Sequence, residues 1–285
     1  MSIFSFLSKK ILSPERPHGL ELVDGRVIIA RTTINCISLA DIYIDCKFMS
    51  VVMFDSNNIY WLKNKTFRNC TFDRCDFKDM ADHGNNFDMC VFERVNFRYS
   101  ILGYDNSKYT NCIFRKVKFG RFIKAIFENC VFEDCDLDGV DFNASSFNQV
   151  SFSGPLRNVW FRGHFPTSSQ EKEFGKSICN EMRKVSFEEA SLHDIDFSDN
   201  CKLSSIVLPA EGLYAYYGEW RKQLKQITED SQKEIHTKEE GALFNRIYSV
   251  RARTQNEYIL NIDDLSKEYS KTFIDMLLRN ATYHT

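Results

Sequence analysis

Residues that could bind a metal or attack a substrate are plentiful in this chain, which has ten cysteines and six histidines. Zinc sites usually hold cysteine pairs separated by roughly two to four residues. The nearest pairs here, Cys70 with Cys75 and Cys130 with Cys135, are five positions apart. The histidines are scattered, and no H-E-x-x-H, G-x-S-x-G or phosphate-binding glycine motif occurs. We expect no metal site, no cofactor, no small-molecule substrate and no enzymatic activity.

Carboxylate pairs are the remaining chemical candidates. Asp134 and Asp136 have the composition of a general acid with a general base. They lie, however, in a stretch where polar residues separate apolar ones at a fixed interval, so a solvated outer surface explains them. The element that carries this interval therefore matters more than any single side chain.

Phenylalanine recurs on a five-residue grid. A period of five matches neither the 3.6 of a helix nor the 2 of a strand, so these rings could not share one face of either element. A small residue or a cysteine tends to stand two positions before each ring. We infer a coil of repeated units, each burying its apolar side by stacking on its neighbours. The grid comprises Phe72, Phe77, Phe87, Phe92, Phe97, Phe127, Phe132, Phe142, Phe147 and Phe152.

Segments such as Cys70-Thr71-Phe72-Asp73-Arg74 and Cys130-Val131-Phe132-Glu133-Asp134 resemble the pentapeptide-repeat proteins. The resemblance implies a mainly β fold, a right-handed quadrilateral β-helix with four pentapeptides per turn and the central rings inside. Free cysteine packs as a small hydrophobe, so the thiols are expected in the core and the protein in a reducing cytoplasm. The expected core is Phe67, Phe72, Phe77, Phe87, Phe92, Phe97, Phe114, Phe119, Phe127, Phe132, Phe142, Phe147, Phe152, Cys70, Cys75, Cys90, Cys130 and Cys135.

The pattern divides the chain into three parts, an N-terminal cap (1–35), the β-helix (36–208) and a C-terminal α-helical domain (209–285). Within the β-helix, Asp82 takes a slot meant for Phe, which predicts an open or distorted side. The grid slips by two residues at 103–106 and recovers by Phe127, which predicts a bulge or loop. A short helix, opened by a Ser168/Glu171 capping box, is expected as an insertion at about 165–184.

The predicted C-terminal helices have their own signals. An apolar stripe runs from Leu213 to Ile227, Thr237 and Glu240 have capping-box spacing, and Asp263 or Asp264 could cap a last helix. Residues 3–12 could form a short amphipathic helix, for which a lid over the first coil is favoured over membrane contact. No apolar stretch approaches the ~18 residues that span a bilayer, so no membrane partner is expected.

Charge is segregated along the β-helix although the whole chain has a net charge of −2. A basic belt is followed directly by an acidic one, and these belts could either pair with each other or orient a partner. Aromatic residues of the C-terminal stripe could anchor a partner or simply pack on the coil end. The candidate partner-binding residues are Lys108, Arg115, Lys116, Lys118, Arg121, Lys124, Glu128, Glu133, Asp134, Asp136, Asp138, Tyr216, Tyr217 and Trp220.

These features predict a protein-binding protein that protects its host by covering a macromolecular target. The favoured version is a bacterial immunity protein or antitoxin that neutralises one toxin. Some relatives implied by the resemblance mimic DNA and shield a type II topoisomerase such as DNA gyrase from quinolones, but the basic belt and the weak net charge count against mimicry. A scaffold or effector that uses the coil as a spacer stays open. Direct nucleic-acid binding is not expected, and a homodimer through the C-terminal helices is compatible with the sequence.

Overall fold

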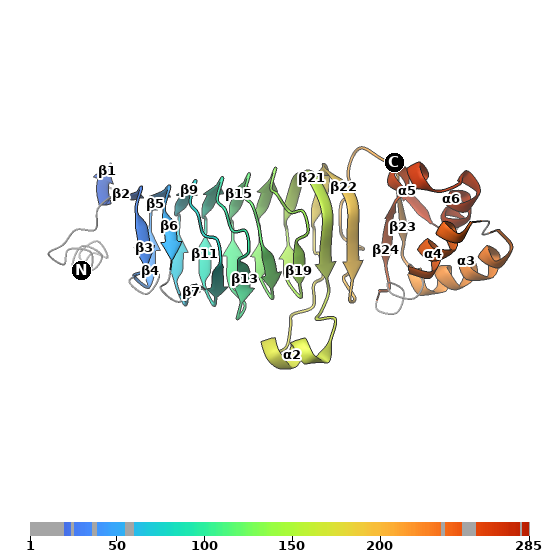
Figure 1. The fold of residues 1–285 in the computed structure, drawn as a ribbon, viewed down its shortest axis with the longest axis horizontal. Coiled ribbons are helices and arrows are strands. Elements are labelled where there is room, and N and C mark those ends of the chain that lie inside the picture. The colour runs from blue at the N-terminus through green and yellow to red at the C-terminus, as the bar shows by residue number, and fades with distance from the viewer. Residues whose placement is uncertain are drawn as a thin grey trace.

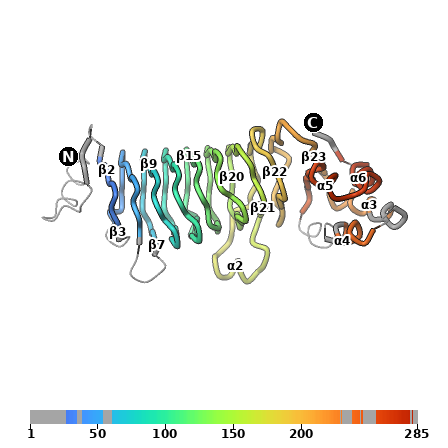
Figure 2. The backbone as a smooth tube through the Cα atoms, turned by 45° about the horizontal axis from the view of Figure 1, so that its top comes forward, coloured from blue at the N-terminus to red at the C-terminus, as the bar shows by residue number. Residues whose placement is uncertain are grey.

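The computed structural model describes residues 20–23, 26–35, 39–54, 60–234, 237–246, 255–279 and 281–284. Short strands stack along the length of the molecule, with helix α2 (Ser168–Phe174) projecting from one side and a C-terminal unit at the far end (Figure 1). The tube in Figure 2 shows that the stack is one continuous coil. The fold is a parallel β-solenoid. The lid predicted for residues 3–12 lies outside the described residues.

The stack is built from many strands, most of three or four residues. They are β1 (Leu20–Val23), β2 (Arg26–Ala30), β3 (Thr33–Asn35), β4 (Ile42–Ile44), β5 (Cys46–Met49), β6 (Val52–Phe54), β7 (Tyr60–Lys63), β8 (Thr66–Arg68), β9 (Thr71–Asp73), β10 (Met80–His83), β11 (Asn86–Asp88), β12 (Val91–Glu93), β13 (Ile101–Tyr104), β14 (Lys108–Thr110), β15 (Ile113–Arg115), β16 (Arg121–Ile123), β17 (Ile126–Glu128), β18 (Val131–Glu133), β19 (Asp141–Asn143), β20 (Ser146–Asn148), β21 (Ser151–Arg162) and β22 (Ser186–Ser198).

Successive coils pair in parallel and in register, so that ring lies over ring. Phe72 of β9 is the partner of Phe92 of β12, twenty residues or four pentapeptides later. The parallel stack begins before the expected residue 36, because β2 already pairs with β5. Strand β1 is antiparallel to β2.

Aromatic rings fill the interior. In one column the ring centroids of Phe72, Phe92 and Phe114 follow at 4.8 and 4.9 Å, with interplanar angles of 7° and 12°. Rings of the adjacent column meet them edge to face, as Phe67 meets Phe72 at 5.4 Å and 69°. Both are favourable aromatic geometries. Every residue of the expected core, cysteines included, is buried.

The corners between strands explain the polar positions of the repeat. Corner residues adopt the left-handed conformation, with φ of 51° at Asn69, 54° at Asn111 and 53° at Asn129. Asn tolerates this region better than most residues. The Asn129 side-chain amide also donates to the Asn111 side-chain oxygen one coil away, at 3.3 Å.

The predicted slip of the grid is present. Phe92 pairs with Phe114, twenty-two residues on, and Phe114 with Phe132, eighteen on, so the coil gains two residues and then loses them. The register of β10 and β13 shifts at this point. Gly103 has a φ of 90°, and a Cβ there would lie 2.4 Å from the Ala125 Cβ, so only glycine fits.

The prediction of an open or distorted side at Asp82 is correct only in its second part. The side is not open, because the residue is completely buried, but the pairing of β10 with β13 is irregular between Ala81 and His83. Asp82 replaces a core ring with a hydrogen-bonded network, described below.

The insertion is less helical than predicted. Helix α2 ends at Phe174, because Gly175 leaves the helix with a φ of 77°. The predicted Ser168/Glu171 capping box does not form, since the cap is Thr167, whose Oγ1 accepts from the Gln170 N–H at 3.3 Å. The chain then returns to the coil at Asn180, whose Oδ1 accepts from the Phe147 N–H at 3.2 Å.

The C-terminal unit mixes helices with a sheet, where the sequence predicted helices alone. Its strands β23, β24 and β25 pair antiparallel, with β23 in the middle. The Thr237/Glu240 capping box is present, but Asp263 and Asp264 lie in the first turn of α5, which Asn261 caps. Its elements are β23 (Tyr214–Tyr217), α3 (Trp220–Glu234), α4 (Lys238–Arg246), β24 (Tyr258–Asn261), α5 (Ile262–Glu268), α6 (Lys271–Leu278) and β25 (Thr282–His284).

None of the helices within the described residues is long and apolar enough to cross a bilayer.

Candidate protein-docking surface

The predicted charge belts lie on neighbouring coils, and much of their charge pairs internally. The Lys108 Nζ is 2.7 Å from the Glu128 carboxylate, and the Arg115 guanidinium contacts Glu133. Asp136 pairs with Arg98, at 2.9 Å. These pairs are partly exposed, so each stabilises the stack by only ~0–1 kcal/mol.

Lys124 is the exception among the predicted basic residues, because it is buried. Its Nζ donates to the Phe174 carbonyl oxygen at 2.8 Å, which ties α2 to the coil. It is therefore unavailable to a partner. Lys116, Lys118, Arg121, Asp134 and Asp138 are exposed, and the structure shows no ion pair for them among the residues it describes.

The aromatic anchors predicted in the C-terminal unit are core residues. Tyr217 and Trp220 are fully buried, with ring centroids 4.7 Å apart. The Tyr217 hydroxyl donates to the Leu277 carbonyl oxygen at 2.6 Å. Tyr216 packs against the coil end, and its hydroxyl lies 2.8 Å from Glu257. Tyr217 and Trp220 thus stabilise this unit and cannot contact a partner in this conformation.

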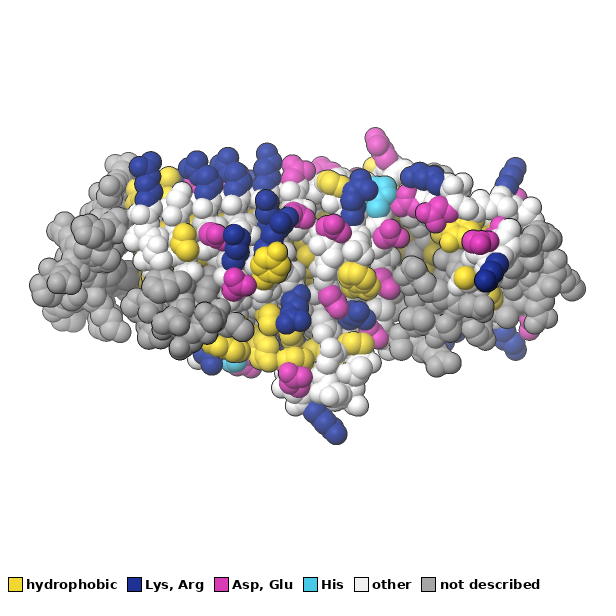
Figure 3. Space-filling model, viewed as in Figure 1, with side chains coloured by type: hydrophobic (Ala, Val, Ile, Leu, Met, Phe, Trp, Pro, Cys, Tyr) yellow, Lys and Arg dark blue, Asp and Glu magenta, His cyan; other side chains and the backbone are white. Residues whose placement is uncertain are grey.

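A different set of rings lies outside the solenoid, and we call it the aromatic face: Trp61 (β7), His83 (β10), Tyr104 (β13) and Phe174 (α2). The Tyr104 ring lies 6.0 Å from Trp61, 5.4 Å from His83 and 5.3 Å from Phe174. Trp61 is 43% exposed, and Lys63 covers its ring at 4.8 Å. Apolar side chains gather on the solenoid near α2 in Figure 3.

Sequence reasoning missed the aromatic face because these rings are out of phase with the grid. Trp61 precedes the inward Leu62 by one residue, and His83 follows the inward Asp82 by one. Neighbouring strand residues point to opposite sides, so both rings must face outward. The sequence did carry a signal for them, since each of these two residues lies one position away from an inward position of the five-residue grid.

The Asp82 network lies directly beneath the aromatic face. The carboxyl group accepts from the Tyr109 hydroxyl at 2.6 Å, the Ser107 hydroxyl at 2.9 Å and the Gly103 N–H at 3.0 Å. The side-chain amide of Asn85 is a fourth donor. Burial raises the pKa of Asp82 above its usual range, against the lowering effect of these hydrogen bonds. The network joins β10 to the bulged coil and so supports the strands that carry His83 and Tyr104.

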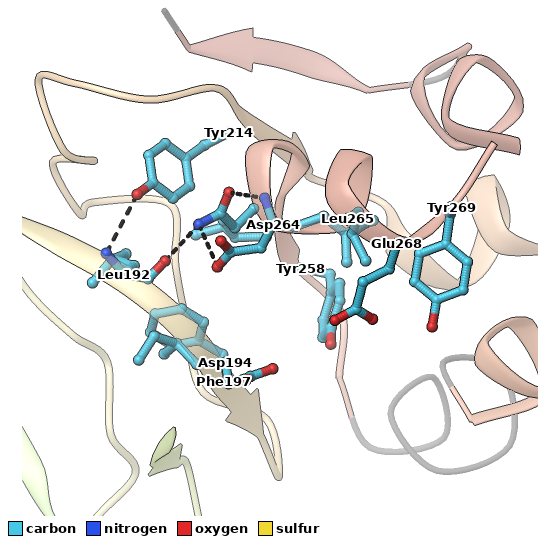
Figure 4. Close-up of a pocket in the computed structure, with 13 residues that line it drawn as sticks. Leu192, Asp194, Phe197, Tyr214, Tyr258, Asp264, Leu265, Glu268 and Tyr269 are labelled. Atoms are coloured by element: carbon cyan, nitrogen blue, oxygen red, sulfur yellow. Dashed lines mark hydrogen bonds between the residues drawn. The ribbon is translucent and has the colours of Figure 1, made fainter. Parts of the chain in front are cut away.

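A small cavity of about 150 Å³ lies between β22 and the C-terminal unit (Figure 4). At its edge the Tyr214 hydroxyl accepts from the Leu192 N–H at 3.4 Å, and the Asn261 amide donates to the Leu192 carbonyl at 2.6 Å. These contacts cover backbone groups of the last strand of the stack, which would otherwise invite another chain to pair. Because these contacts cover the backbone at the end of the stack, we assign the junction a capping role.

An ion pair links the same two parts, since His193 Nδ1 lies 2.9 Å from the Asp264 carboxylate. Burial acts to raise the pKa of Asp264, but hydrogen bonds from Lys267 and His193 outweigh it and hold that pKa below its usual value.

A comparison with known protein families matches part of the solenoid. Residues 121–154 match the family model for pentapeptide repeats, with eight copies. This part of the solenoid consists of pentapeptide repeats. The comparison with curated proteins gives no significant match.

Two of the solved structures similar to this chain illustrate how low the sequence identity to its structural neighbours is. A trypsin-treated form of QnrB1, a plasmid-mediated fluoroquinolone resistance protein, is 12% identical with a TM-score of 0.34, over 60% of this chain and 90% of that one. HetL, from the cyanobacterium Nostoc sp. strain PCC 7120 and involved in heterocyst differentiation regulation, is 8% identical with a TM-score of 0.22, over 73% and 93%.

Proposed function

We propose that this protein is a non-enzymatic, cytoplasmic protein-binding protein that protects its host by covering a macromolecular target, and that the aromatic face is its docking surface. The observation that carries the proposal is the position of Trp61, Tyr104 and Phe174 outside the ring-filled core. The coil closes without them, because Leu62, Asp82 and Leu102 fill the inward positions of the strands beneath them.

The chemistry of the aromatic face favours a protein as the partner. Trp and Tyr are enriched among the few residues that dominate binding energy at protein interfaces, where they lie in desolvated centres with a polar rim. Lys63 and Asp105 are polar neighbours of these rings, with Asp105 3.8 Å from His83. Truncating Trp61 should therefore cost a complex at least ~2 kcal/mol, or about thirtyfold in affinity.

Charge distribution favours toxin neutralisation over DNA mimicry. Residues 60–124 contain thirteen Lys and Arg against seven Asp and Glu, a formal net charge of +6. A DNA mimic needs a persistently negative surface, since duplex DNA carries one charge per ~1.7 Å of axis. Three of the four rings of the aromatic face, Trp61, His83 and Tyr104, belong to this positive half. An immunity protein or antitoxin that blocks an acidic region of one toxin fits that arrangement, with topoisomerase shielding as the alternative.

Each of the three parts of the chain would then have its own role in docking or in closing the coil. We propose that residues 36–208 form the docking scaffold, that the insertion at about 165–184 extends the aromatic face through Phe174, and that residues 1–35 and 209–285 close the two ends. The contacts of Tyr214 and Asn261 with Leu192 support the closing role of the C-terminal part.

Affinity capture from extracts of the source organism tests the proposal, using wild type, Trp61→Ala/Tyr104→Ala and the control Met89→Ala. Met89 is 47% exposed at a corner beside β11, so it matches Trp61 in exposure but lies away from the aromatic face. We expect one protein captured by wild type and Met89→Ala and lost from the double variant. Stoichiometric addition of the protein should abolish the captured partner's activity.

Two results would overturn the proposal. Equal capture by all three variants would remove the aromatic face from the interaction. Protection of gyrase supercoiling from a quinolone, with no other captured partner, would replace toxin neutralisation with the topoisomerase alternative.

A further inference from the structure

One corner of the solenoid forms a straight row of charged side chains, which we call the corner ridge: Arg74, Arg94, Lys116 and Asp134. Each residue adopts φ between 50° and 53°, so all four leave the backbone in the same way. Each N–H donates to the next coil, from Arg74 to Glu93 at 2.9 Å, from Arg94 to Arg115 at 2.9 Å and from Lys116 to Glu133 at 2.9 Å. The members are therefore one coil apart, or ~4.8 Å.

The sign of the corner ridge changes once, between Lys116 and Asp134. Both side chains are exposed, and neither has an ion pair among the residues the structure describes. Figure 3 shows Lys and Arg along the upper edge of the first coils, followed by Asp and Glu. Next along the acidic side come Gly154, which has no side chain, and then its strand partner Ala190, which follows the exposed Glu188 and Glu189 near the start of β22.

The same change of sign holds for the whole solenoid. The formal net charge is +6 over residues 60–124, whereas residues 125–208 contain seven Lys and Arg against fourteen Asp and Glu, a net charge of −7. The two halves are nearly equal and opposite. A rod with this distribution is complementary to a copy of itself turned end for end.

We propose that two copies of this chain associate side by side and antiparallel along the corner ridge, with a two-fold axis between Lys116 and Asp134. The axis places Lys116 of each copy opposite Asp134 of the other, as an isologous interface requires. One coil further out, Arg94 faces the bare Gly154, which allows close approach. Two coils out, Arg74 lies opposite Ala190, beside the exposed Glu188 and Glu189 that precede Ala190 on β22.

A second copy explains this pattern better than an unrelated partner. Any dipolar protein could meet one half of the ridge, but equal charge on both sides of a central boundary is required only for self-pairing. Complementary fields of this kind set register and suppress the parallel arrangement, in which like charges would meet. The contact differs from dimerisation through the C-terminal helices, and it leaves the aromatic face free.

Charge reversal tests the two-fold axis. Lys116→Glu should oppose two carboxylates across the axis, and Asp134→Lys two ammonium groups, so each variant alone should be monomeric. Mixed one to one, they restore an attractive pair at both positions and should form a heterodimer. Lys172→Glu, an exposed change of the same charge in α2, is the control and should dimerise like wild type. Sedimentation velocity measures all four samples.

Salt supplies a second measurement. Raising the salt concentration from about 0.05 M to about 0.5 M should weaken the wild-type dimer at least about tenfold, because exposed charges are screened. Carbodiimide cross-linking of a mixture of ¹⁴N- and ¹⁵N-labelled wild type should join Lys116 of a copy with one isotope to Asp134 of a copy with the other. This experiment uses wild type alone, so it does not depend on the folding of any variant. A wild type that is monomeric at low salt, a mixture that stays monomeric, or cross-links confined to one isotope would overturn the proposal.

Discussion

Replacing Asp82 with the apolar residue that its slot in the coil normally holds should destabilise the protein. In Asp82→Leu the hydroxyl of Tyr109 and the N–H of Gly103 lose their acceptor, and the structure shows no other for them. Each buried, unpaired donor costs ~1–3 kcal/mol. Burying the leucine side chain returns ~1.5–3 kcal/mol. We expect a net loss of about 2 kcal/mol in the free energy of unfolding, measured by urea titration with circular dichroism.

A double-mutant cycle isolates the network from the cavity and size effects of the leucine. Tyr109→Phe removes the orphaned hydroxyl, so adding it to Asp82→Leu should cost less than adding it to wild type. We expect a coupling energy of ~1–3 kcal/mol, as found for groups in one hydrogen-bond network. An Asp82→Leu protein as stable as wild type, or strictly additive effects, would refute the reasoning.

The pH dependence of stability tests how the ionisation of Asp82 affects folding. Because burial raises the pKa of Asp82, the folded protein holds this proton more tightly than the unfolded chain does. Its contribution to stability is therefore present below the unfolded pKa of ~4 and falls as pH rises through the folded pKa. The stability of wild type relative to Asp82→Asn should decline upward from about pH 4, and a constant or rising difference would contradict the assignment.

Three further predictions concern the bulge, the thiols and the C-terminal junction. Gly103→Ala should cost at least ~3 kcal/mol, or prevent soluble expression, because its Cβ would overlap Ala125, whereas Gly139→Ala, whose Cβ would meet only the Asn158 amide at 3.9 Å, should cost only ~1 kcal/mol in thermal melts. Burial raises the pKa of Cys75 and of Cys135 to about 12, so both should resist Ellman's reagent at pH 8 until urea unfolds the coil, and rapid labelling of the native protein would contradict this. Because the pKa of Asp264 is lowered in the fold, its stabilising effect is present above pH ~4 and lost below it, so the protection factor of the Leu192 amide against hydrogen exchange, relative to the unfolded chain at the same pH, should fall in acid for wild type and be low at all pH values for Asp264→Asn.

The five-residue period predicted the coil because one repeated geometric constraint acts on every unit. Phe72, Phe92 and Phe132 each occupy the same kind of position, so the evidence accumulates along the chain. The two-residue slip was predictable for the same reason, since the phase recovers at Phe127. Asp82 could not be placed, because three partners that lie 21 to 27 residues further along the chain, together with Asn85, decide whether its carboxyl group can be buried.

In the C-terminal unit, the helical period of the apolar residues predicted the wrong secondary structure for the residues from Tyr214 to Tyr217. The residues from Tyr214 to Tyr217 fit the apolar stripe of a helix, but they alternate: Tyr214 and Tyr216 pack on the coil end, while Ala215 and Tyr217 pack on the helices. Such alternation is typical of a strand buried on both faces. Four residues are too few to separate the two periods, and only the coil end supplies the second buried side.

The most direct test of the proposed function is photo-cross-linking inside the source cells. A photoreactive phenylalanine analogue placed at position 61 should capture one protein partner, and the same analogue at the equally exposed position 89 should capture none. Cross-links of equal yield at the two positions, or none at position 61, would contradict a docking role for the aromatic face.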